Sequence, residues 1–369
     1  MKLIPSIPGY RTLDRYILGK FLRTYIFGVM MMVVIVVVFD YVEKVDDFTE
    51  LHAPWSAIVN DYYLNFIPYF INQFSSLFTF ISVIFFTSKM AMQTEIVAIL
   101  SGGVSFRRMM WPYFMGAAII AMLSLSLNLW IIPQGQRDSI VFQSKYLKSS
   151  LNKLYDEHVY RQLEPDTYVY VRGYYPEISR VPFFAIERFE GAQMVETLNA
   201  ASASFDEESG RWTAPRYVIY SRNEDGSLGY KQYRNLDTLI NLDARELSDI
   251  KGLTQTMTID ELNDFLAQQR RKGSDDLFLI EVARHSRFSY PFSTFILTLI
   301  GVSLASRKVR GGMGVHIGLG ITLCFSYIMV GRVSEQVAIS GSIAPWLGVW
   351  LPNIVFALIA IYVYIKAPK

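Results

Sequence analysis

The sequence predicts a membrane α-helical bundle of six transmembrane helices, with one extracytoplasmic all-β domain inserted between the third and the fourth. Six charge-poor apolar stretches run along the chain, and one polar segment, residues 133–276, divides them into two groups of three. That segment contains short runs of alternating polar and apolar residues. Hydrophobic residues are 51% and charged residues 18% of the 369, a composition typical of an integral membrane protein.

The apolar stretches are long enough to cross a bilayer, because a transmembrane helix needs about 20 apolar residues. We place the spans at 16–40, 57–87, 109–132, 288–306, 314–332 and 345–365. No small-residue cleavage site follows the first stretch, so we expect it to remain as an anchor. The chain thus divides into residues 1–132 with three spans, an inserted domain at 133–276, and residues 277–369 with three more spans.

Basic residues mark one side of the predicted spans. They precede the first span, separate the second from the third and the fourth from the fifth, and follow the sixth: Lys2, Arg11, Arg15, Lys20, Arg23, Lys89, Arg107, Arg108, Arg307, Lys308, Arg310, Lys366 and Lys369. Cytoplasmic loops carry an excess of Lys and Arg, so we expect cytoplasmic termini and an extracytoplasmic domain. The net charge of +2 gives no indication of nucleic-acid binding.

The inserted domain has the pattern of an antiparallel β structure. Residues 167–171, 216–220 and 230–233 alternate between apolar and polar side chains. A small sandwich, a jelly roll and an open barrel would each bury such faces, and the residues do not choose among them. After the strands, Thr258 and Glu261 form a capping box that begins a helix, which we expect to stop at Gly273.

Polar side chains inside the spans are expected to face other helices or a wet cavity, because hydrocarbon penalises them. They are Asn72, Gln73, Ser75, Ser76, Ser124, Ser126 and Asn128. The single cysteine, Cys324, lies in the fifth predicted span, which excludes an intrachain disulfide framework and a thiolate metal cluster. We expect no metal and no cofactor, and the four acids of residues 39–47 leave a divalent ion that bridges lipid phosphates as an open alternative.

The connection between the second and the third span is more ordered than a minimal loop. Thr94 is placed to cap a short helix, and Gly102 and Gly103 are placed to end it. Glu95 suits the positive N-terminal end of that helix, and an apolar stripe follows it: Ile96, Val97, Ile99 and Leu100. A helix lying in the lipid interface and a helix docked on a partner both fit this pattern.

Three motifs, together with the order of spans and domain, resemble one known family. They are Leu13-Asp14-Arg15-Tyr16, the run from Glu95 to Gly103, and Pro133-Gln134-Gly135. Over nearly its whole length the chain resembles the LptF/LptG (YjgP/YjgQ) permeases, and it looks closer to LptG. The resemblance implies a periplasmic β-jellyroll and a multi-pass protein of the bacterial inner membrane.

The implied function is that of a permease subunit of an ATP-binding cassette transporter. In the family, such subunits extract lipopolysaccharide from the inner membrane and pass it to a periplasmic bridge for outer-membrane assembly. The implied partners are a cytoplasmic LptB-like ATPase dimer, a second LptF/LptG-like permease, and LptC-like and LptA-like periplasmic proteins. This chain has no Gly-x-x-x-x-Gly-Lys-Ser/Thr phosphate loop, so we expect the ATP hydrolysis to come from a partner.

The resemblance also implies roles for particular residues. Residues 94–103 correspond to the coupling helix, and Glu95 matches the family's acidic residue that enters the ATPase groove. Its expected companions at that surface are Thr94, Ile96, Ile99, Leu100 and Gly102.

The family places basic residues at the outer rim of the first span, where they hold lipid phosphates. Here residues 39–47 contain four acids and one lysine, Lys44, so only Lys44 carries over. Arg137 and Lys145, with Lys148, are further candidates for lipid binding. An ion pair with a neighbouring acid, or an anchor at the membrane interface, is an equally open interpretation of Lys44.

Two other classes of function remain as alternatives. A membrane enzyme would need convergent acid, base or metal groups, and only His285 and His316 lie at span level, where we expect polar packing. A membrane-anchored sensor or scaffold would bind a ligand with its extracytoplasmic β domain. No kinase, receiver or coiled-coil output domain follows the spans, which counts against that alternative.

Overall fold

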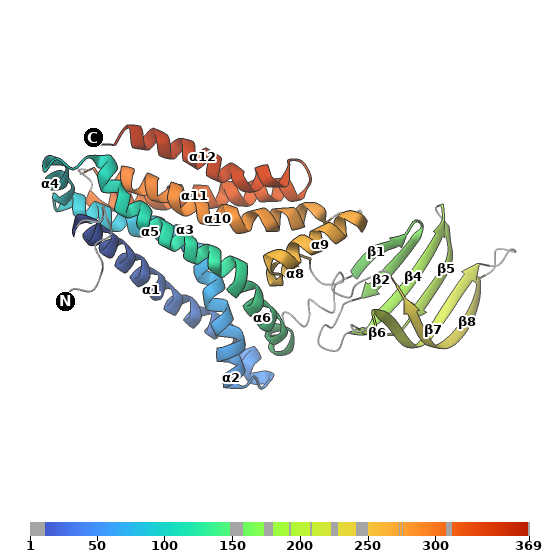
Figure 1. The fold of residues 1–369 in the computed structure, drawn as a ribbon. Coiled ribbons are helices and arrows are strands. Elements are labelled where there is room, and N and C mark those ends of the chain that lie inside the picture. The colour runs from blue at the N-terminus through green and yellow to red at the C-terminus, as the bar shows by residue number, and fades with distance from the viewer. Residues whose placement is uncertain are drawn as a thin grey trace. The chain divides into compact units, whose positions relative to one another are not determined.

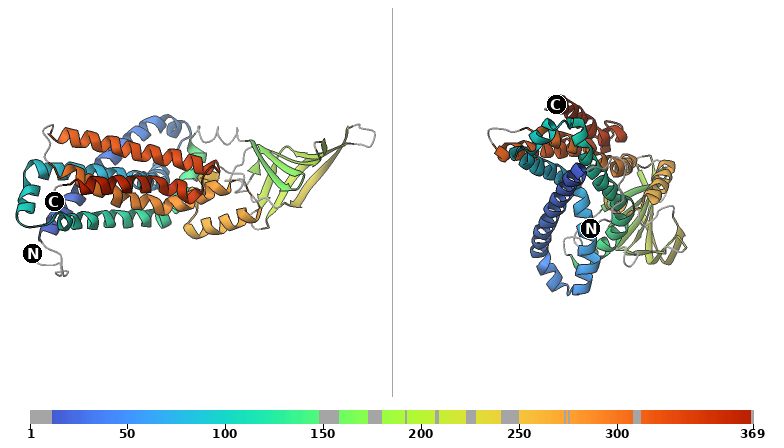
Figure 2. Two further views of the ribbon diagram at one scale, coloured as in Figure 1. Left: turned by 90° about the horizontal axis from the view of Figure 1, so that it is seen from above. Right: turned by 60° about the vertical axis from the view of Figure 1, so that its left-hand side comes forward.

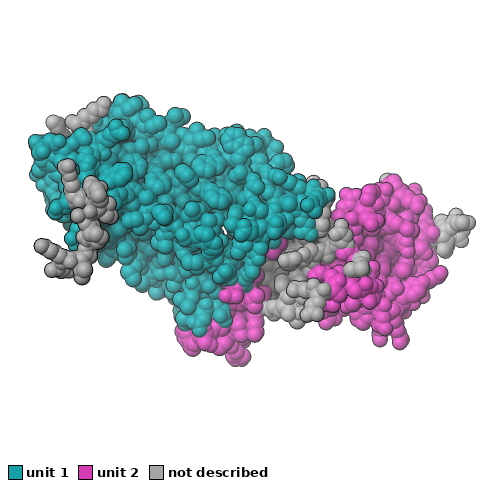
Figure 3. All heavy atoms as spheres, viewed as in Figure 1, with its two compact units in different colours: residues 1–43, 59–137, 254–369 teal, residues 44–58, 138–253 magenta. Residues whose placement is uncertain are grey.

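The computed structural model describes residues 12–147, 158–172, 180–191, 193–206, 209–222, 228–240, 250–272, 274, 276–307 and 312–367. The chain forms two compact units (Figure 3). Unit 1 comprises residues 1–43, 59–137 and 254–369, and unit 2 comprises residues 44–58 and 138–253. Several residues of the sequence analysis lie outside the described ranges: Lys2, Arg11, Lys148, Gly273, Lys308, Arg310 and Lys369.

Six helices in the described ranges are long and apolar enough to cross a membrane, as predicted (Figure 1). The first is α1 (Thr12–Glu50); the second runs from α2 (Trp55–Ala57) through the π-helix η1 (Ile58–Tyr63) into α3 (Leu64–Met92); the third runs from α5 (Phe106–Ser126) through the π-helix η2 (Leu127–Ile131) into α6 (Ile132–Tyr146); the last three are α10 (Leu277–Ala305), α11 (Gly312–Ile339) and α12 (Pro345–Ile365). The chain is therefore a multi-pass membrane protein.

Several helices are longer than the apolar stretches that predicted them. With 39 residues, α1 begins four residues before the predicted span and ends ten after it. At 1.5 Å per residue its length is about 58 Å, well beyond a hydrocarbon core of about 30 Å. Hydropathy marks the part of a helix that crosses lipid, and polar turns continue the hydrogen-bonded ladder at both ends.

The bundle of unit 1 is built around α10, which contacts α3, α5, α11 and α12. Its apolar centre joins α3, α10, α11 and α12 through Phe80, Ile84, Leu297, Cys324 and Phe356. The helices run lengthwise beside one another (Figure 2). Only the first part of α1 is packed on them, and its second part leaves the bundle (Figures 1 and 2).

Polar side chains in the spans face other helices, which confirms that prediction for several of them. Ser124 Oγ donates to Asn72 Oδ1 at 2.6 Å, the Ser75 and Tyr25 hydroxyls are 3.0 Å apart, and those of Ser76 and Ser293 are 2.5 Å apart. Asn72, Gln73 and Ser76 also line a cavity with Tyr290, Arg332 and Glu335. Ser126 instead donates to its own helix, at the Met122 carbonyl.

Unit 2 contains an antiparallel sheet, so the all-β prediction is confirmed. Its strands are β1 (His158–Glu164), β2 (Thr167–Arg172), β3 (Arg180–Val181), β4 (Phe183–Glu190), β5 (Gln193–Ala200), β6 (Ala203–Asp206), β7 (Arg211–Arg222) and β8 (Leu228–Leu239). Their order is β1-β2-β4-β5-β7-β6-β3, and β8 pairs with β7. The long strand β7 pairs with β6 through residues 211–213 and with β5 through 217–221.

The register of the sheet collects its apolar side chains on one face. Val171 pairs with Phe184, Phe184 with Ala200, and Ala200 with Tyr217. These residues belong to one cluster with Trp212, whose ring lies 5.4 Å from that of Phe184. The alternation in the sequence thus becomes the apolar core of this unit.

Two short helices, α8 (Ile250–Thr256) and α9 (Ile259–Lys272), follow the sheet along the chain. The predicted capping box at the start of α9 is confirmed. The Thr258 amide donates to Glu261 Oε2 at 2.8 Å, and the Glu261 amide donates to Thr258 Oγ1 at 3.4 Å. Two backbone donors at this helix end are thereby satisfied.

Candidate functional site

The connection between α3 and α5 forms a helix, α4 (Glu95–Ser101), of the predicted extent. Gly102 follows it, and Gly103 has φ +83°, the left-handed conformation that favours glycine. The predicted cap by the Thr94 side chain is wrong. Thr94 itself is left-handed, with φ +59°, and its hydroxyl donates to the Gln93 carbonyl at 2.6 Å, so it does not reach the helix amides.

The apolar stripe of α4 is turned toward the chain's own bundle. Ile96 is 1% exposed and lies in a cluster with Phe106, Met109 and Met110 of α5. Ile99 and Leu100 pack partly against the same cluster. Val97 is the exception, since 56% of it is exposed. A partner can therefore reach Thr94 and Gly102, which are exposed, whereas Ile96 supports the helix from within.

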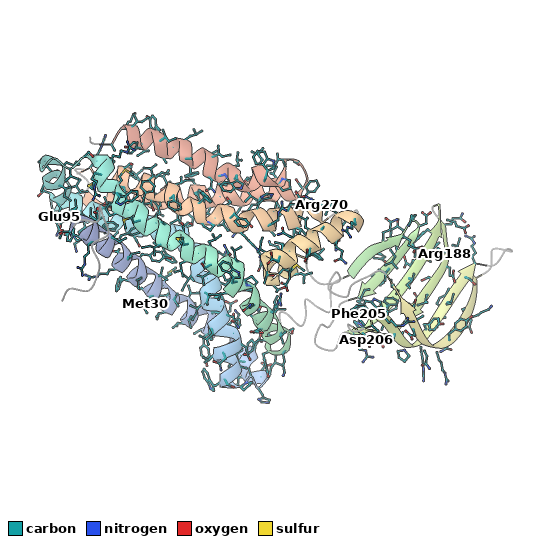
Figure 4. All side chains as sticks on the ribbon, viewed as in Figure 1. Met30, Glu95, Arg188, Phe205, Asp206 and Arg270 are labelled. Carbon is teal, nitrogen blue, oxygen red and sulfur yellow. The ribbon has the colours of Figure 1, made fainter. Side chains whose placement is uncertain are left out.

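Glu95 lies at the N-terminal end of α4 (Figure 4), where two side chains of α1 bind its carboxylate. Lys20 Nζ is 3.1 Å from both carboxylate oxygens, and the Tyr16 hydroxyl donates to Oε2 at 2.8 Å. The Lys20 ammonium also lies 4.3 Å from the centroid of the Tyr16 ring. Sequence reasoning missed both residues, although their spacing of four puts them on one helix face.

A second ion pair joins α1 to α5 close to α4. The Arg108 guanidinium donates to both oxygens of Asp14, each at 2.6 Å, and Asp14 is fully buried. The Arg108 amide also donates to Ser105 Oγ at 3.3 Å, which caps α5. Bidentate pairs of this kind fix geometry as well as charge. The start of α1 is thus attached to both helices that follow α3.

The structure gives the basic candidates for lipid binding separate surroundings. Arg137 Nε donates to the Thr256 carbonyl at 2.9 Å, and its guanidinium forms an ion pair with Glu261. Lys145 lies 5.2 Å from the ring centroid of its neighbour Tyr146. Lys44 is half-buried on α1. Arg137 therefore holds α6 to the turn between α8 and α9.

The surroundings of the Glu261 carboxylate in that turn change its pKa. The Thr258 backbone amide holds the pKa of Glu261 below its ordinary value; burial, the next largest effect, opposes this lowering, and the Arg137 guanidinium adds to it. Glu261 is thus an anion at neutral pH. Its negative charge is stabilising there, because it lies in the first turn of α9, at the positive end of the helix dipole.

His285 and His316, the two histidines at the level of the predicted spans, make polar contacts within the bundle. His316 is buried, and its Nδ1 lies 2.9 Å from Ser88 Oγ. His285 Nε2 is 3.3 Å from a nitrogen of Arg284. Within the described ranges, no group of three or more His, Cys, Asp or Glu side chains is placed to hold a metal ion.

Comparison with known proteins gives one consistent result. The family model described as lipopolysaccharide export system permease LptF/LptG matches residues 15–366. The lipopolysaccharide export system permease protein LptG of Escherichia coli (strain K12) is 18% identical over 371 residues, which cover 97% of this chain and 99% of that protein. Both matches run through the spans and the inserted sheet without dividing them.

Proposed function

The chain belongs to the LptF/LptG family of lipopolysaccharide export system permeases, and from this premise we propose that it is a permease subunit of an ATP-binding cassette transporter. Its cargo is lipopolysaccharide, which it extracts from the inner membrane and passes to a periplasmic bridge for outer-membrane assembly. The observation that carries the proposal is the family match over residues 15–366. The full-length similarity to E. coli LptG supports it and favours the LptG branch.

The same proposal assigns an orientation. The membrane is the bacterial inner membrane, both termini are cytoplasmic, and the inserted β domain is periplasmic. The distribution of Lys and Arg supports this assignment, because these residues accumulate in the connections on the α4 side of the spans. In this orientation α4 faces the cytoplasm, where ATP is available.

The energy for extraction comes from a cytoplasmic LptB-like ATPase dimer that docks on α4. Glu95 is the proposed contact, since its side chain is still 28% exposed beside Lys20. The exposed residues Thr94, Val97 and Gly102 extend the surface around it. Ile96, Ile99 and Leu100 anchor α4 to the bundle, so a push on α4 reaches the spans. The remaining partners are a second LptF/LptG-like permease and LptC-like and LptA-like proteins.

Extraction needs a sheltered path, because exposing each acyl methylene to water costs about 0.8 kcal/mol. The exposed apolar side chains of α1 between Met30 and Val42 supply one wall of such a path, and the second permease supplies the other. The apolar face of the sheet in unit 2 then accepts the acyl chains. Lys44 remains the proposed phosphate contact on α1. Arg137 must give up its ion pair with Glu261 before it can bind a phosphate.

The proposal is tested by co-purification and by transport in proteoliposomes. The parent chain is co-expressed with the partners proposed above. It is expected to bring down a cytoplasmic ATPase and to release lipopolysaccharide to a soluble acceptor when ATP is added. Glu95→Arg should lose the ATPase, and Glu95→Gln, which keeps the size of the side chain, should weaken it. A photo-crosslinking scan of residues 40–47 then locates the lipid.

The outcomes separate the candidate functions. A sensor or scaffold would bring down no ATPase, and an enzyme would be active alone. Undiminished ATPase binding and lipid release by Glu95→Arg would rule out the role of Glu95 in docking.

A further inference from the structure

A groove of about 280 Å³ lies on the surface of the bundle, where α10 packs against both α5 and α12. Its lining is apolar apart from one guanidinium: Arg107, Met110, Trp111, Phe114, Leu299 and Tyr364. The four residues from α5 recur at spacings of three and four, so they share one face of that helix. None of the lining residues belongs to α1, on which the path for the cargo was proposed.

The groove lies at the end of the bundle that carries α4 (Figure 1). Arg107 is in the first turn of α5, Leu299 is in the last two turns of α10, and Tyr364 is in the last turn of α12. At 1.5 Å per residue, Arg107 and Phe114 are about 10 Å apart along α5. One leaflet of hydrocarbon is about 15 Å thick. The groove therefore fits within one leaflet, which is the cytoplasmic one in the orientation proposed above.

A row of aromatic rings continues the apolar surface from the groove along α10. The Phe114 ring stacks on that of Phe295 with centroids 6.5 Å apart. Phe295 lies 6.5 Å from Phe292, which is 5.3 Å from Trp350 of α12. Phe292 is 54% exposed. An acyl chain packs on such a surface by van der Waals contact, which drives association inside a bilayer.

Arg107 places a positive charge at the rim of this apolar surface. It is exposed, whereas its neighbour Arg108 is held by Asp14. None of the residues that the structure describes forms an ion pair with Arg107. A guanidinium binds phosphate through two parallel hydrogen bonds. Trp111, which is 55% exposed, and Tyr364 are of the residue types that gather at the level of lipid headgroups.

We propose that this groove binds an anionic phospholipid, with the lipid phosphate on Arg107 and one acyl chain over Trp111 and Leu299. Charge complementarity identifies the occupant, because none of the six lining residues is acidic and one is a cation. Basic pockets between spanning helices on the cytoplasmic side bind anionic headgroups. A zwitterionic lipid carries a cation of its own, which Arg107 repels. The site goes beyond the proposed function, since its ligand is a bound lipid and not the cargo.

The test measures which lipid touches Trp111 in the full chain, embedded in phosphatidylcholine nanodiscs. Brominated acyl chains quench tryptophan fluorescence on contact. Phosphatidylglycerol, which is anionic, and phosphatidylcholine, which is zwitterionic, are compared with the same brominated chains at increasing fractions of the bilayer. The chain has six tryptophans, so every variant is measured with and without Trp111→Phe, and the difference gives the Trp111 signal. Nanodiscs expose both membrane faces, so the result does not depend on the proposed orientation.

In the parent we expect the apparent affinity at Trp111 to be about fivefold higher for phosphatidylglycerol, the effect of one basic residue at a membrane surface. Arg107→Gln should abolish this preference, and Arg107→Lys should keep part of it, because an ammonium keeps the charge without the planar fork. Leu299→Phe, which narrows the groove and leaves Arg107 in place, should reduce the preference. Arg23→Gln is the matched control, since Arg23 is exposed on α1 outside the groove, and it should behave as the parent.

Three results would overturn the lipid site. They are equal affinities for the two lipids in the parent, a parental preference in Arg107→Gln, and an equal loss in Arg107→Gln and Arg23→Gln, which would indicate surface charge in general. A parental preference in Leu299→Phe would overturn the placement of the acyl chain in the groove. If Arg107→Gln does not accumulate, Arg107→Lys and Leu299→Phe decide by the same measurement. Co-purification of an ATPase is independent of these results, so the lipid site and the proposed function fail separately.

Discussion

Arg108 donates a hydrogen bond to each oxygen of Asp14, both at 2.6 Å, while Asp14 is fully enclosed by protein. The two residues are 94 positions apart in the chain, on the first turns of α1 and α5. A carboxylate without water depends on its partner for its charge. The ion pair can therefore form only when the start of α1 is packed on α5.

Arg108→Ala should remove the bidentate cation from the buried Asp14 carboxylate and cost about 3 kcal/mol of stability. We expect a lower midpoint of thermal unfolding in detergent. Arg107→Ala removes the same charge from the neighbouring, exposed position and should shift the stability by less than about 0.5 kcal/mol. Asp14→Asn in the Arg108→Ala background should recover part of the loss. Equal midpoints for the two arginine variants would contradict the prediction.

Gly116→Ala tests the close approach of α1 and α5. A Cβ at Gly116 would stand 2.4 Å from Cδ1 of Phe21, whose side chain is fully buried. The expected cost is about 1–3 kcal/mol, because overpacking forces side chains off their rotamers. Gly19→Ala is the control, since nothing lies within 4 Å of its added Cβ, and it should be neutral or slightly stabilising. The measurement is the detergent midpoint of both variants, and a Gly116→Ala midpoint equal to that of Gly19→Ala would refute the tight contact.

What the sequence predicted well is local in the chain. Each apolar stretch corresponds to a long helix, because a span is made of consecutive residues. The alternating runs at 167–171 and 216–220 lie in β2 and β7, since side chains alternate along any strand. The capping box of Thr258 and Glu261 depends on a spacing of three and was equally accessible.

What it did not predict depends on contacts between distant residues. Glu95 was singled out, but its contacts with Lys20 and Tyr16 join positions 75 and 79 residues apart, and a hydrophobic pattern does not encode which helices become neighbours. The orientation of α4 has the same origin. The pattern of its apolar stripe does not say what the stripe packs against. In the structure it packs against Met109 and Met110 of the chain's own bundle.

The core of the sheet gives a third prediction. Trp212 is fully buried between Phe184 and Phe205, with ring centroids at 5.4 Å and 5.1 Å. Trp212→Ala should cost about 3–5 kcal/mol and leave a cavity among β4, β6 and β7. Limited proteolysis of the full chain should then cut within 158–240 faster than in the parent. Tyr230→Ala, at an exposed position of the same sheet, should be cut at the parental rate, and equal rates for both variants would mean that the stacking contributes little.

The turn between α8 and α9 gives a pH dependence whose sign follows from Glu261. The amide of Thr258 and the guanidinium of Arg137 lower the pKa of Glu261 in the folded chain, whereas the unfolded value is about 4.3. The stabilisation is therefore fully present above the unfolded pKa and is lost as the pH falls through the lower, folded pKa. At pH 7 the parent should unfold at a higher temperature than Glu261→Gln, which keeps the shape of the capping box and removes the charge. Below a pH of about 4.3 the two midpoints should converge.

The experiment is a series of thermal unfolding curves from pH 7 downward for both proteins, with Asp260→Asn, one residue away, as the control for loss of an acid from the same helix turn. A difference between parent and Glu261→Gln that stays constant over the whole series would show that the carboxylate charge is not what stabilises this turn.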